Sequence, residues 1–284
     1  MNVLLAVLAA VVVGTWNGNW FPSGRAKHRA HPDVEAATIA ASAKMLAGGL
    51  ARIDPEGTND VILCLNEIRN RAVATNLIAQ IGREGLRVVS VSAYRWSDRF
   101  DEQQDVIATT LPCAAANWSK WRQCGNTTPP RGYAFAAVVI EPAVTAHVYA
   151  VHLKSNYRAM TPDVRESNRM KRAHAIEQIV SQEKPSRARK HRVCRPVIVA
   201  GDMNADRWSE DFAEEKIFIR LEKAGFSNLL AELPEGARGT HLSKSYGDSA
   251  LDYVFVRELS SVAKPCVVPN DALSDHCALF TVVE

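Results

Sequence analysis

Short apolar runs rich in β-branched residues recur along the whole chain and alternate with longer amphipathic stretches. Apolar runs of this length, bounded by polar or Gly/Pro-containing segments, are typical of buried β-strands. They are found at residues 10–16, 61–65, 86–92, 105–111, 133–140, 146–153, 196–200, 251–256 and 277–283. Helical spacing of apolar residues predicts helices at residues 34–50, 71–83, 163–182 and 210–224. Strands and helices mixed in this way predict an α/β protein whose sheets are covered by helices.

The first ten residues allow two interpretations. Val3 to Val13 is apolar and rich in Ala, like the core of an export signal, but no Lys or Arg precedes it. The same segment leads directly into Val11-Val12-Val13, which is typical of a buried strand. We therefore expect residues 1–10 to be an export-signal remnant or the start of the first strand, followed by one domain over residues 11–284. Export would make the protein secreted or periplasmic, and without export it is cytoplasmic.

Composition fits a globular protein with a large core. Of the 284 residues, 47% are hydrophobic and 23% are charged. The net charge of +3 is mildly basic and compatible with a polyanionic partner such as a nucleic acid. No run of 18 or more apolar residues occurs, so we expect no membrane insertion. We expect a monomer.

Six cysteines raise the question of disulfides. Cys113 and Cys124 flank a polar segment that we interpret as a loop, and a disulfide between them would close it. Cys194 and Cys266 each lie close to a proline and form a second candidate pair. No CxxC sequence occurs, which argues against a zinc site. Disulfides would favour an oxidising compartment.

Polar clusters at the ends of apolar runs carry the candidate chemistry. The six clusters are Trp16-Asn17, Asn66-Glu67, His152-Leu153-Lys154-Ser155, Gly201-Asp202-Met203-Asn204, Leu251-Asp252-Tyr253 and Ser274-Asp275-His276. We expect strands from distant parts of the chain to bring these side chains to one place. Carboxylates, amides and two histidines suit a hard divalent cation and a phosphate group. The sequence therefore predicts an enzyme that cuts phosphate esters.

Two of the clusters suggest how a water and a cation are held. Glu67 follows a buried strand and can bind Mg²⁺, although an acid that complements the dipole of the following helix is the simpler explanation for this residue alone. Asp202 and Asn204 alternate to the same side of the chain, where they can orient a water and bind an oxyanion. An Asx turn is the alternative for this pair. Asn17 would hydrogen-bond an acid or the phosphate.

The histidine-containing clusters point to phosphate contacts. Asp275 and His276 precede a buried strand, so alternation should send them to opposite sides. Asp252 is then the better partner to fix the tautomer of His276. Lys154 should share the side of His152 and meet a phosphate. The remaining histidines, at positions 28, 31, 147, 174, 191 and 241, show no metal-ligand spacing.

Three further features have two interpretations each. Arg131 stands at the start of a strand, where it can hold a phosphate or face solvent. Trp118 and Trp121 can stack on bases or pack the segment that contains them. The basic run at residues 184–195 invites a nucleic-acid interpretation. Because it leads into the far end of the strand that precedes Asp202, roughly 20 Å away, a solvated loop is the better explanation.

Taken in order, the clusters resemble those of the endonuclease/exonuclease/phosphatase superfamily, which includes pancreatic-type deoxyribonuclease. The resemblance spans residues 11–283 and implies a four-layered α/β sandwich of two packed mixed β-sheets flanked by helices. It implies a divalent-metal-dependent phosphodiesterase that uses Mg²⁺, with Mn²⁺ or Ca²⁺ as alternatives. We expect a nuclease that hydrolyses DNA or RNA. The alternative is a phosphatase or sphingomyelinase-type enzyme acting on inositol phosphates or lipids.

The resemblance also implies roles at the cation and the attacking water. Glu67 resembles the principal Mg²⁺ ligand of the family, with Asn17 beside it and Asp275 as a second acidic ligand. Asp202 resembles the residue that orients or deprotonates the attacking water. Asn204 resembles the amide that positions this water and stabilises the transition state.

Other positions resemble residues that bind substrate. His276, held by Asp252, resembles an imidazole that contacts the phosphate, and His152 matches a second histidine of the deoxyribonuclease and phosphatase branches. Arg131 resembles a phosphate-binding arginine. Thr240 resembles a threonine shortly upstream of the Leu-Asp-Tyr motif.

The sequence departs from the family pattern at two points. The deoxyribonuclease branch supports its first histidine with a glutamate, and no glutamate aligns here. Asp98 or Asp101 is the candidate substitute for it. Asn66 replaces the common Gln before the metal-binding glutamate.

Overall fold

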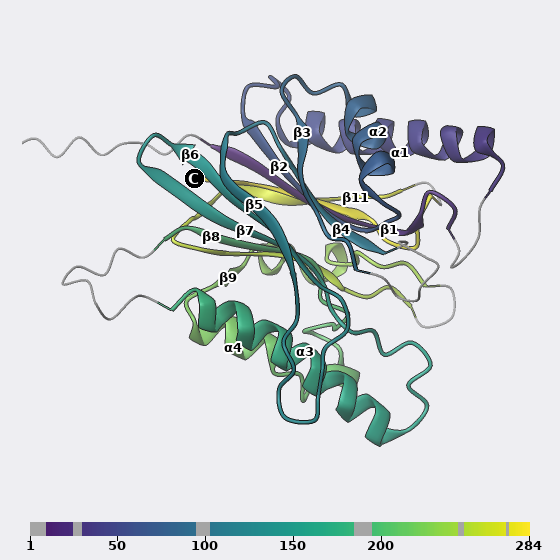
Figure 1. Ribbon diagram of the computed structural model, residues 1–284, viewed down its shortest axis with the longest axis vertical. Coiled ribbons are helices and arrows are strands. Elements are labelled where there is room, and N and C mark those ends of the chain that lie inside the picture. The colour runs from purple at the N-terminus through teal and green to yellow at the C-terminus, as the bar shows by residue number, and fades with distance from the viewer. Residues whose placement is uncertain (1–9, 25–29, 95–102, 185–194, 244–246, 271–272) are drawn as a thin grey trace, which may run out of the picture.

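The computed structural model describes residues 10–24, 30–94, 103–184, 195–243, 247–270 and 273–284. Two six-stranded mixed sheets lie face to face at its centre (Figure 1). The first sheet has the order β11-β12-β1-β2-β4-β3, formed by β1 (Val11–Phe21), β2 (Asp60–Ile68), β3 (Arg87–Val91), β4 (Gln104–Thr109), β11 (Ser261–Val268) and β12 (Ala278–Val283). The second has the order β5-β6-β7-β8-β10-β9, formed by β5 (Cys113–Lys120), β6 (Gly132–Glu141), β7 (Val144–His152), β8 (Val197–Asp202), β9 (Ser227–Asn228) and β10 (Asp252–Arg257).

Helices cover the outer face of each sheet. Figure 1 shows α1 (Pro32–Ile53) and α2 (Arg71–Ile81) on one side, and α3 (Pro162–Gln182) and α4 (Ile217–Lys223) on the other. Short 3₁₀ turns lie at Glu210–Phe212, Leu229–Glu232 and Glu235–Ala237. The predicted four-layered α/β sandwich is therefore confirmed.

Strand β2 shows why the central strands have continuous apolar sequences. Val61 and Leu63 pack toward α1 and α2, in a cluster with Leu46 and Leu77 of these helices. Their neighbour Ile62 packs into the core between the two sheets. A strand with both faces buried needs apolar residues at every position, because successive side chains point to opposite faces.

Helix boundaries follow from local capping. Helix α2 begins after Asn70, whose side chain accepts a hydrogen bond from the Val73 amide at 3.0 Å, and it ends at Gly82. Gly82 has φ of 73°, a left-handed conformation that glycine adopts without steric cost. Helix α3 begins after Thr161 with Pro162 in its first turn, where proline removes no helical hydrogen bond.

The structure contains three strands that the hydrophobic pattern did not predict, β5, β11 and the two-residue β9. Strand β5 replaces the expected loop between Cys113 and Cys124. The expected disulfide between them is wrong, since both are free thiols and an extended strand of roughly 25 Å lies between them. Cys266 is also a free thiol, and Cys194 lies outside the described residues.

Two expectations about the chain ends and membranes have different outcomes. Residues 1–9 lie outside the described residues, and β1 begins at Val11, so an export signal stays a prediction. None of the helices in the described part of the chain is long and apolar enough to cross a membrane.

The basic run predicted to be a solvated loop also falls mainly outside the described residues, at 185–194.

Candidate active site

Strand pairing brings the polar clusters together. Parallel pairing places Asn17 of β1 opposite Asn66 of β2, and His152 of β7 opposite Asp202 of β8. Antiparallel pairing places Asp252 of β10 opposite Asp202. Asn17 donates to the Asp202 carboxylate and Asn66 accepts the Asp202 amide, and these hydrogen bonds join the two sheets at this edge.

Bulges and strained backbone aim several of these side chains. Both β1 and β2 carry a register shift, between Asn17 and Phe21 and between Leu65 and Ile68. Asn17 and Glu67 therefore lie within strands, and not beyond their ends as the apolar pattern suggested. Glu67 has φ of 58°, and Asn204 and Arg131 also have positive φ. Such conformations cost on the order of 1–3 kcal/mol each and concentrate at functional sites, where bulges redirect side chains.

Asn17 links the two acidic residues of the site. Its Nδ2 donates to Asp202 Oδ2 at 2.9 Å and to Glu67 Oε1 at 3.3 Å. Its Oδ1 accepts the Asn19 amide at 2.9 Å. With 1% of its surface exposed, Asn17 holds these two carboxylates in place from behind the open part of the site.

Glu67 is held by donors from three directions. Besides Asn17, its Oε2 accepts the Trp20 amide at 3.0 Å and Gln103 Nε2 at 2.7 Å. Gln103 Oε1 in turn accepts from Arg131 Nη1 at 3.0 Å. Gln103 was not predicted as a site residue, because only the pairing of β2 with β4 brings its segment beside Glu67.

Asp202 stands at the centre of the hydrogen-bond network. Its Oδ1 accepts the Asn204 amide at 2.7 Å and its Oδ2 accepts Asn204 Nδ2 at 2.9 Å. The first contact is the Asx turn weighed for this sequence, so the turn and the clustering coexist. Burial raises the pKa of Asp202 to about 7, with His276 lowering it and Asp252 raising it. A carboxylate with this pKa can exchange a proton near neutral pH.

Gly201, just before Asp202, is required by the close approach of two strands. A Cβ at this position would lie 2.0 Å from the Val151 carbonyl oxygen, and φ is 141°. The glycine therefore permits this parallel pairing of β7 and β8.

His276 and Asp252 form the hydrogen-bonded pair expected from the sequence, with Nδ1 and Oδ2 2.7 Å apart. Burial lowers the pKa of His276, but the carboxylates of Asp252, Asp202 and Asp275 together raise it to about 10. In the absence of a cation the imidazole therefore carries a proton on both nitrogens. Its Nε2 lies 3.9 Å from Asp202 Oδ2.

Thr240 positions Asp252 and has no surface to offer a substrate. It is fully buried, and its Oγ1 accepts the backbone amides of Leu251 at 3.0 Å and Asp252 at 2.9 Å. Its hydroxyl faces only protein here, so its place in substrate binding stays a prediction that the buried position does not favour.

His152 lies between the two acidic groups. Its Nε2 is 3.5 Å from Asp202 Oδ2 and 3.6 Å from Glu67 Oε1. Burial first, and then the nearby Arg131, hold the pKa of His152 well below its usual value, so the ring is neutral at pH 7. Its Nδ1 is buried and has no hydrogen-bond partner among the residues described. Asp98 and Asp101, the candidate substitutes for the glutamate that supports this histidine in the deoxyribonuclease branch, lie outside the described residues.

The two cationic residues expected to bind phosphate lie beside His152. Arg131 donates from Nε to the His152 carbonyl at 3.2 Å and from Nη2 to the Leu153 carbonyl at 2.8 Å. It is thus half-buried against the strand end and does not face open solvent. Lys154 is also half-buried, and burial lowers the pKa of its amine.

Asp275 lies beside two histidines, and its role as a second acidic cation ligand stays a prediction. Its carboxylate lies 3.7 Å from His241 Nε2 and 4.0 Å from His276 Nε2. The predicted alternation of Asp275 and His276 is wrong, because both precede the first residue of β12 and are not part of a regular strand.

A buried polar chain supports the site from behind. Asn66 Oδ1 accepts the Asp202 amide at 3.0 Å, and Asn66 Nδ2 donates to Asp105 Oδ1 at 2.7 Å. The hydroxyl of Tyr94 donates to the other oxygen of Asp105. Burial raises the pKa of Asp105 to about 7. These hydrogen bonds explain why Asn66 precedes Glu67. The short Asn66 side chain reaches both Asp105 and the backbone of Asp202.

The two tryptophans weighed as base-stacking residues have separate environments. Trp121 is buried, and its ring packs on Tyr133 with centroids 4.9 Å apart, as the packing interpretation required. Trp118 is half-buried and meets the edge of Tyr94 at 5.8 Å.

The Glu67 carboxylate fits a hard divalent cation. Mg²⁺ takes one or two carboxylates together with waters and substrate oxygens. Glu67 supplies such a carboxylate at the edge where the two sheets meet, whereas Asn17 turns its amide nitrogen toward Glu67 and its oxygen toward the Asn19 amide.

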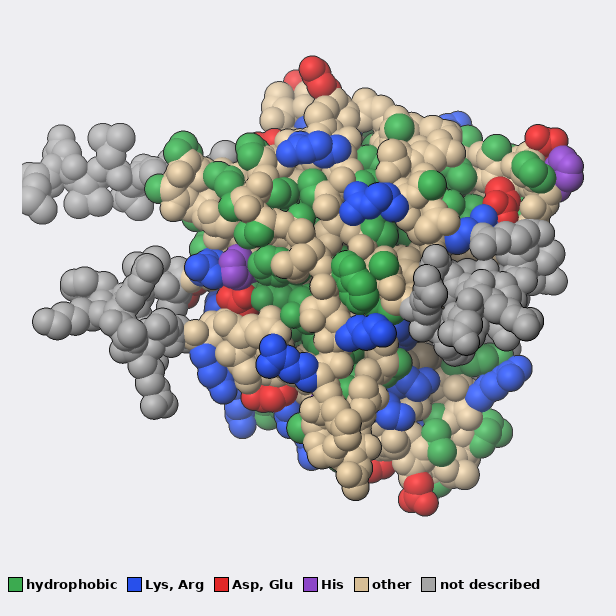
Figure 2. Space-filling view, viewed as in Figure 1, with side chains coloured by type: hydrophobic (Ala, Val, Ile, Leu, Met, Phe, Trp, Pro, Cys, Tyr) green, Lys and Arg blue, Asp and Glu red, His purple; other side chains and the backbone are tan. Residues whose placement is uncertain are grey.

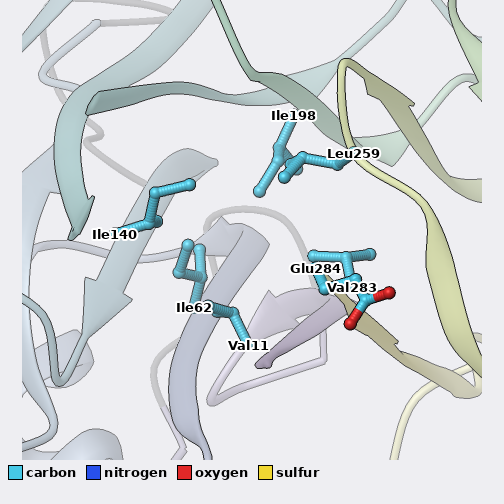
Figure 3. Close-up of a pocket in the computed structure, with 7 residues that line it drawn as sticks. All are labelled: Val11, Ile62, Ile140, Ile198, Leu259, Val283 and Glu284. Carbon is cyan, nitrogen blue, oxygen red and sulfur yellow. The ribbon is translucent and has the colours of Figure 1, made fainter. Parts of the chain in front are cut away.

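An apolar recess lies between the sheets, away from these groups. Figure 3 shows it lined by Val11, Ile62, Ile140, Ile198, Leu259, Val283 and Glu284. Ile198 precedes Asp202 by four positions in β8, which is about 13 Å along a strand. The recess holds no group from the polar site and has no part in its chemistry.

The sandwich and its edge of carboxylates, amides and imidazoles define a class, the hydrolytic phosphoesterases of α/β-sandwich type. The model of the Endonuclease/Exonuclease/phosphatase family matches residues 14–276. The chain therefore belongs to this family. Enzymes of the family are typically dependent on a divalent metal.

Solved structures share the fold at low sequence identity. An endonuclease/exonuclease/phosphatase from Beutenbergia cavernae is 15% identical with a TM-score of 0.63, and the match covers 97% of this chain and 72% of that chain. D. rerio TDP2 complexed with single-strand DNA product is 14% identical with a TM-score of 0.61, covering 97% and 99%. Sphingomyelinase C from Streptomyces griseocarneus is 16% identical with a TM-score of 0.58, covering 96% and 99%. No curated protein matches the chain significantly.

Proposed function

We propose that this protein is a divalent-metal-dependent phosphodiesterase, and specifically a nuclease. The observation that carries the proposal is the position of Asp202. It shares the Asn17 amide with Glu67 and has His152 and His276 within 4 Å. A base, a cation ligand and two imidazoles around one point are the groups that hydrolysis of a phosphodiester needs.

Asp202 prepares the attacking water. Its carboxylate accepts the proton as the water oxygen bonds to phosphorus, and its pKa of about 7 suits this exchange. Asn204 and Asn17 fix the orientation of the carboxylate through their amide groups. Because all three side chains are buried, little reorganisation is needed at the moment of reaction.

The two histidines bind the phosphate in different protonation states. His276, held by Asp252, presents a charged Nε2–H that attracts a nonbridging oxygen. Neutral His152 donates a hydrogen bond without adding charge. Glu67 is the residue that would hold the cation, with Asn17 beside it. When bound, a divalent cation neutralises the phosphate and stabilises the leaving oxygen.

Surface chemistry near the site supports a nucleic acid as the substrate. The segment after β7 carries half-buried Lys154 and an exposed Tyr157, with the Arg158 guanidinium 5.2 Å from the Tyr157 ring. The segment after β8 carries the partly exposed Trp208, with Arg238 stacked on it at 4.3 Å. Aromatic rings paired with cations suit exposed bases and phosphates. Figure 2 shows further Lys and Arg side chains over the half of the molecule that contains α3.

A lipid phosphodiester is the second candidate, favoured by one observation. Tyr157 and Met160, in the segment that follows β7, are 76% and 86% exposed. Exposed apolar side chains near a phosphoesterase site are suited to a lipid surface. One of the solved structures of similar fold is a sphingomyelinase C, so sphingomyelin is a suitable test substrate for this alternative.

A substrate panel tests the proposal. Supercoiled DNA, single-stranded RNA, abasic duplex, sphingomyelin and inositol phosphates are incubated with Mg²⁺ and with chelator. We expect cleavage of a nucleic acid with Mg²⁺, none with chelator, and loss of about 10²–10⁴-fold in Asp202→Ala. Asp163→Asn, an exposed acid in the first turn of α3, is the matched control and should cleave normally. Release of phosphocholine or phosphate without nucleic-acid cleavage would transfer the assignment to the second candidate.

A further inference from the structure

A second group of metal-ligating side chains lies beside the proposed catalytic residues. His241, Asp275 and His276 each offer one ligand atom, and these atoms lie within 4.8 Å of one another. The rings of His241 and His276 meet edge to face with centroids 4.8 Å apart. The family resemblance assigned no role to His241, and its spacing in the sequence indicated none.

The backbone holds these three residues in register. His241 forms isolated β-bridges with Ser249 and with His276. The Leu242 amide donates to the Asp275 carbonyl at 2.7 Å, and the Cys277 amide donates to the Thr240 carbonyl at 2.7 Å. The arrangement is therefore built by main-chain hydrogen bonds on both sides of the group and does not depend on exposed side chains meeting by chance.

Asp252 orients His276 as metal-binding histidines are oriented. Its carboxylate accepts from Nδ1 of His276 at 2.7 Å, which leaves Nε2 between the carboxylates of Asp202, at 3.9 Å, and Asp275, at 4.0 Å. A carboxylate on the far nitrogen is the usual support of a histidine ligand and increases its basicity. This contact is an observation independent of the clustering of the three ligands.

The distances suit a small ion after a modest closure. Asp275 oxygens lie 3.7 Å from His241 Nε2 and 4.0 Å from His276 Nε2. Ligand atoms about 2.0–2.1 Å from a tetrahedral ion are roughly 3.4 Å apart. Asp275 has 45% of its side chain exposed and His241 has 22%, so an ion can reach the group from solvent.

We propose that His241, Asp275 and His276 bind a divalent first-row transition metal ion, at a site distinct from the oxygen-rich Glu67 site. Two imidazoles and one carboxylate favour ions such as Zn²⁺, Fe²⁺ or Co²⁺, whereas Mg²⁺ prefers oxygen ligands. The inference rests on the proposed function only in sharing His276, whose Nε2 must lose its proton to bind the ion. A bound transition metal ion would therefore compete with the phosphate for this nitrogen.

Cobalt binding tests this proposal directly. Co²⁺ is titrated into the full chain in excess Mg²⁺, which fills the oxygen-rich site, and the visible absorption of nitrogen-ligated Co²⁺ is followed. We expect saturation at one equivalent in the wild type. We expect His241→Gln and Asp275→Asn to weaken binding by about 10-fold or more, since even indirect ligand supports contribute 10- to 100-fold. His174→Gln, which alters a half-exposed histidine of α3, is the matched control and should bind as the wild type does.

Two outcomes would overturn the proposal. One is a wild-type protein without the absorption band, and the other is a His241→Gln protein that is folded by circular dichroism and binds Co²⁺ with unchanged affinity. Glu67→Gln separates this inference from the proposed function. It should retain the Co²⁺ band while losing Mg²⁺-dependent cleavage. If the protein shows the Co²⁺ band but cleaves none of the substrates, the proposed function is wrong and the metal site still stands.

Discussion

Asn17 Nδ2 lies 2.9 Å from Asp202 Oδ2, although 185 residues separate them in sequence. Asn17 belongs to the first sheet and Asp202 to the second, so this hydrogen bond joins the two sheets at the edge that carries the site. The same nitrogen donates to Glu67 at 3.3 Å. One amide thus couples the proposed base to the proposed cation ligand, and several predictions depend on this link.

Activity should fall as pH decreases through the titration of Asp202. Burial raises the pKa of this carboxyl to about 7, and only its ionised form can accept a proton from water. The measurement is kcat/KM against pH at saturating Mg²⁺. We expect an acidic limb with its midpoint at or slightly below about pH 7, because a nearby cation favours the ionised form. Activity that is unchanged down to the ordinary aspartate pKa of 3.8 would exclude Asp202 as the base.

Substituting Asn17 should move this acidic limb. The Asn17 hydrogen bond lowers the pKa of Asp202, so Asn17→Ala removes a donor that stabilises the ionised form. We expect the midpoint of the kcat/KM profile to move to higher pH, with a lower plateau. Asn76→Ala, on the exposed face of α2, provides the control and should leave the profile in place. A lower plateau with no shift would limit Asn17 to a purely structural contribution.

Glu67→Gln should weaken the response to Mg²⁺. The amide keeps the shape of the side chain but removes the negative charge that attracts the cation. We expect the Mg²⁺ concentration for half-maximal activity to rise by about 10-fold or more. The check is a Mg²⁺ titration of cleavage for the variant and the wild type. An unchanged half-maximal concentration would mean that the cation binds elsewhere.

The metal-free protein should lose stability as pH rises, because of His276. Its pKa is raised from 6.5 to about 10 in the folded state. A group with a raised folded pKa contributes stability that is complete below the unfolded pKa and is lost as pH rises through the folded pKa. The free energy of urea unfolding in chelator should therefore decrease between about pH 6.5 and about pH 10. Asp252→Asn removes the carboxylate that contributes most to the raised pKa, so its decrease should be smaller.

Gly201→Ala should be strongly destabilising, unlike a Gly→Ala substitution at a position where the added Cβ has free space. The new Cβ would lie 2.0 Å from the Val151 carbonyl oxygen, so β7 and β8 must separate. We expect a loss of about 3–5 kcal/mol in the free energy of unfolding. Gly48→Ala, in α1 with nothing within 4 Å of the added Cβ, should instead add about 0.5–1 kcal/mol. Equal effects of the two substitutions on urea unfolding would refute the close-approach argument.

The sequence located most of the site because its residues interrupt apolar runs. Glu67, His152, Asp202 and Asp252 each adjoin or end a strand that is otherwise apolar, and a polar residue there is conspicuous. Gln103 and His241 carried no such signal, since neither lies within an apolar run. Only pairing with distant segments, through β2 with β4 and through the His241–His276 bridge, makes them neighbours of the site.

By itself, the sequence determined most of the strands, the helices and the identity of the polar groups at the strand ends, while the four-layered arrangement followed from the family resemblance. Burial on both faces imposes continuous apolar runs on the strands, burial on one face imposes a helical period on the helices, and both patterns can be read along the chain. Tertiary structure decided which oxygen faces which nitrogen. It placed Asp275 beside His241, buried Thr240, and made β5 a strand where a disulfide loop was expected. These outcomes depend on register, bulges and positive φ at single residues, which arise from contacts between segments far apart in the chain.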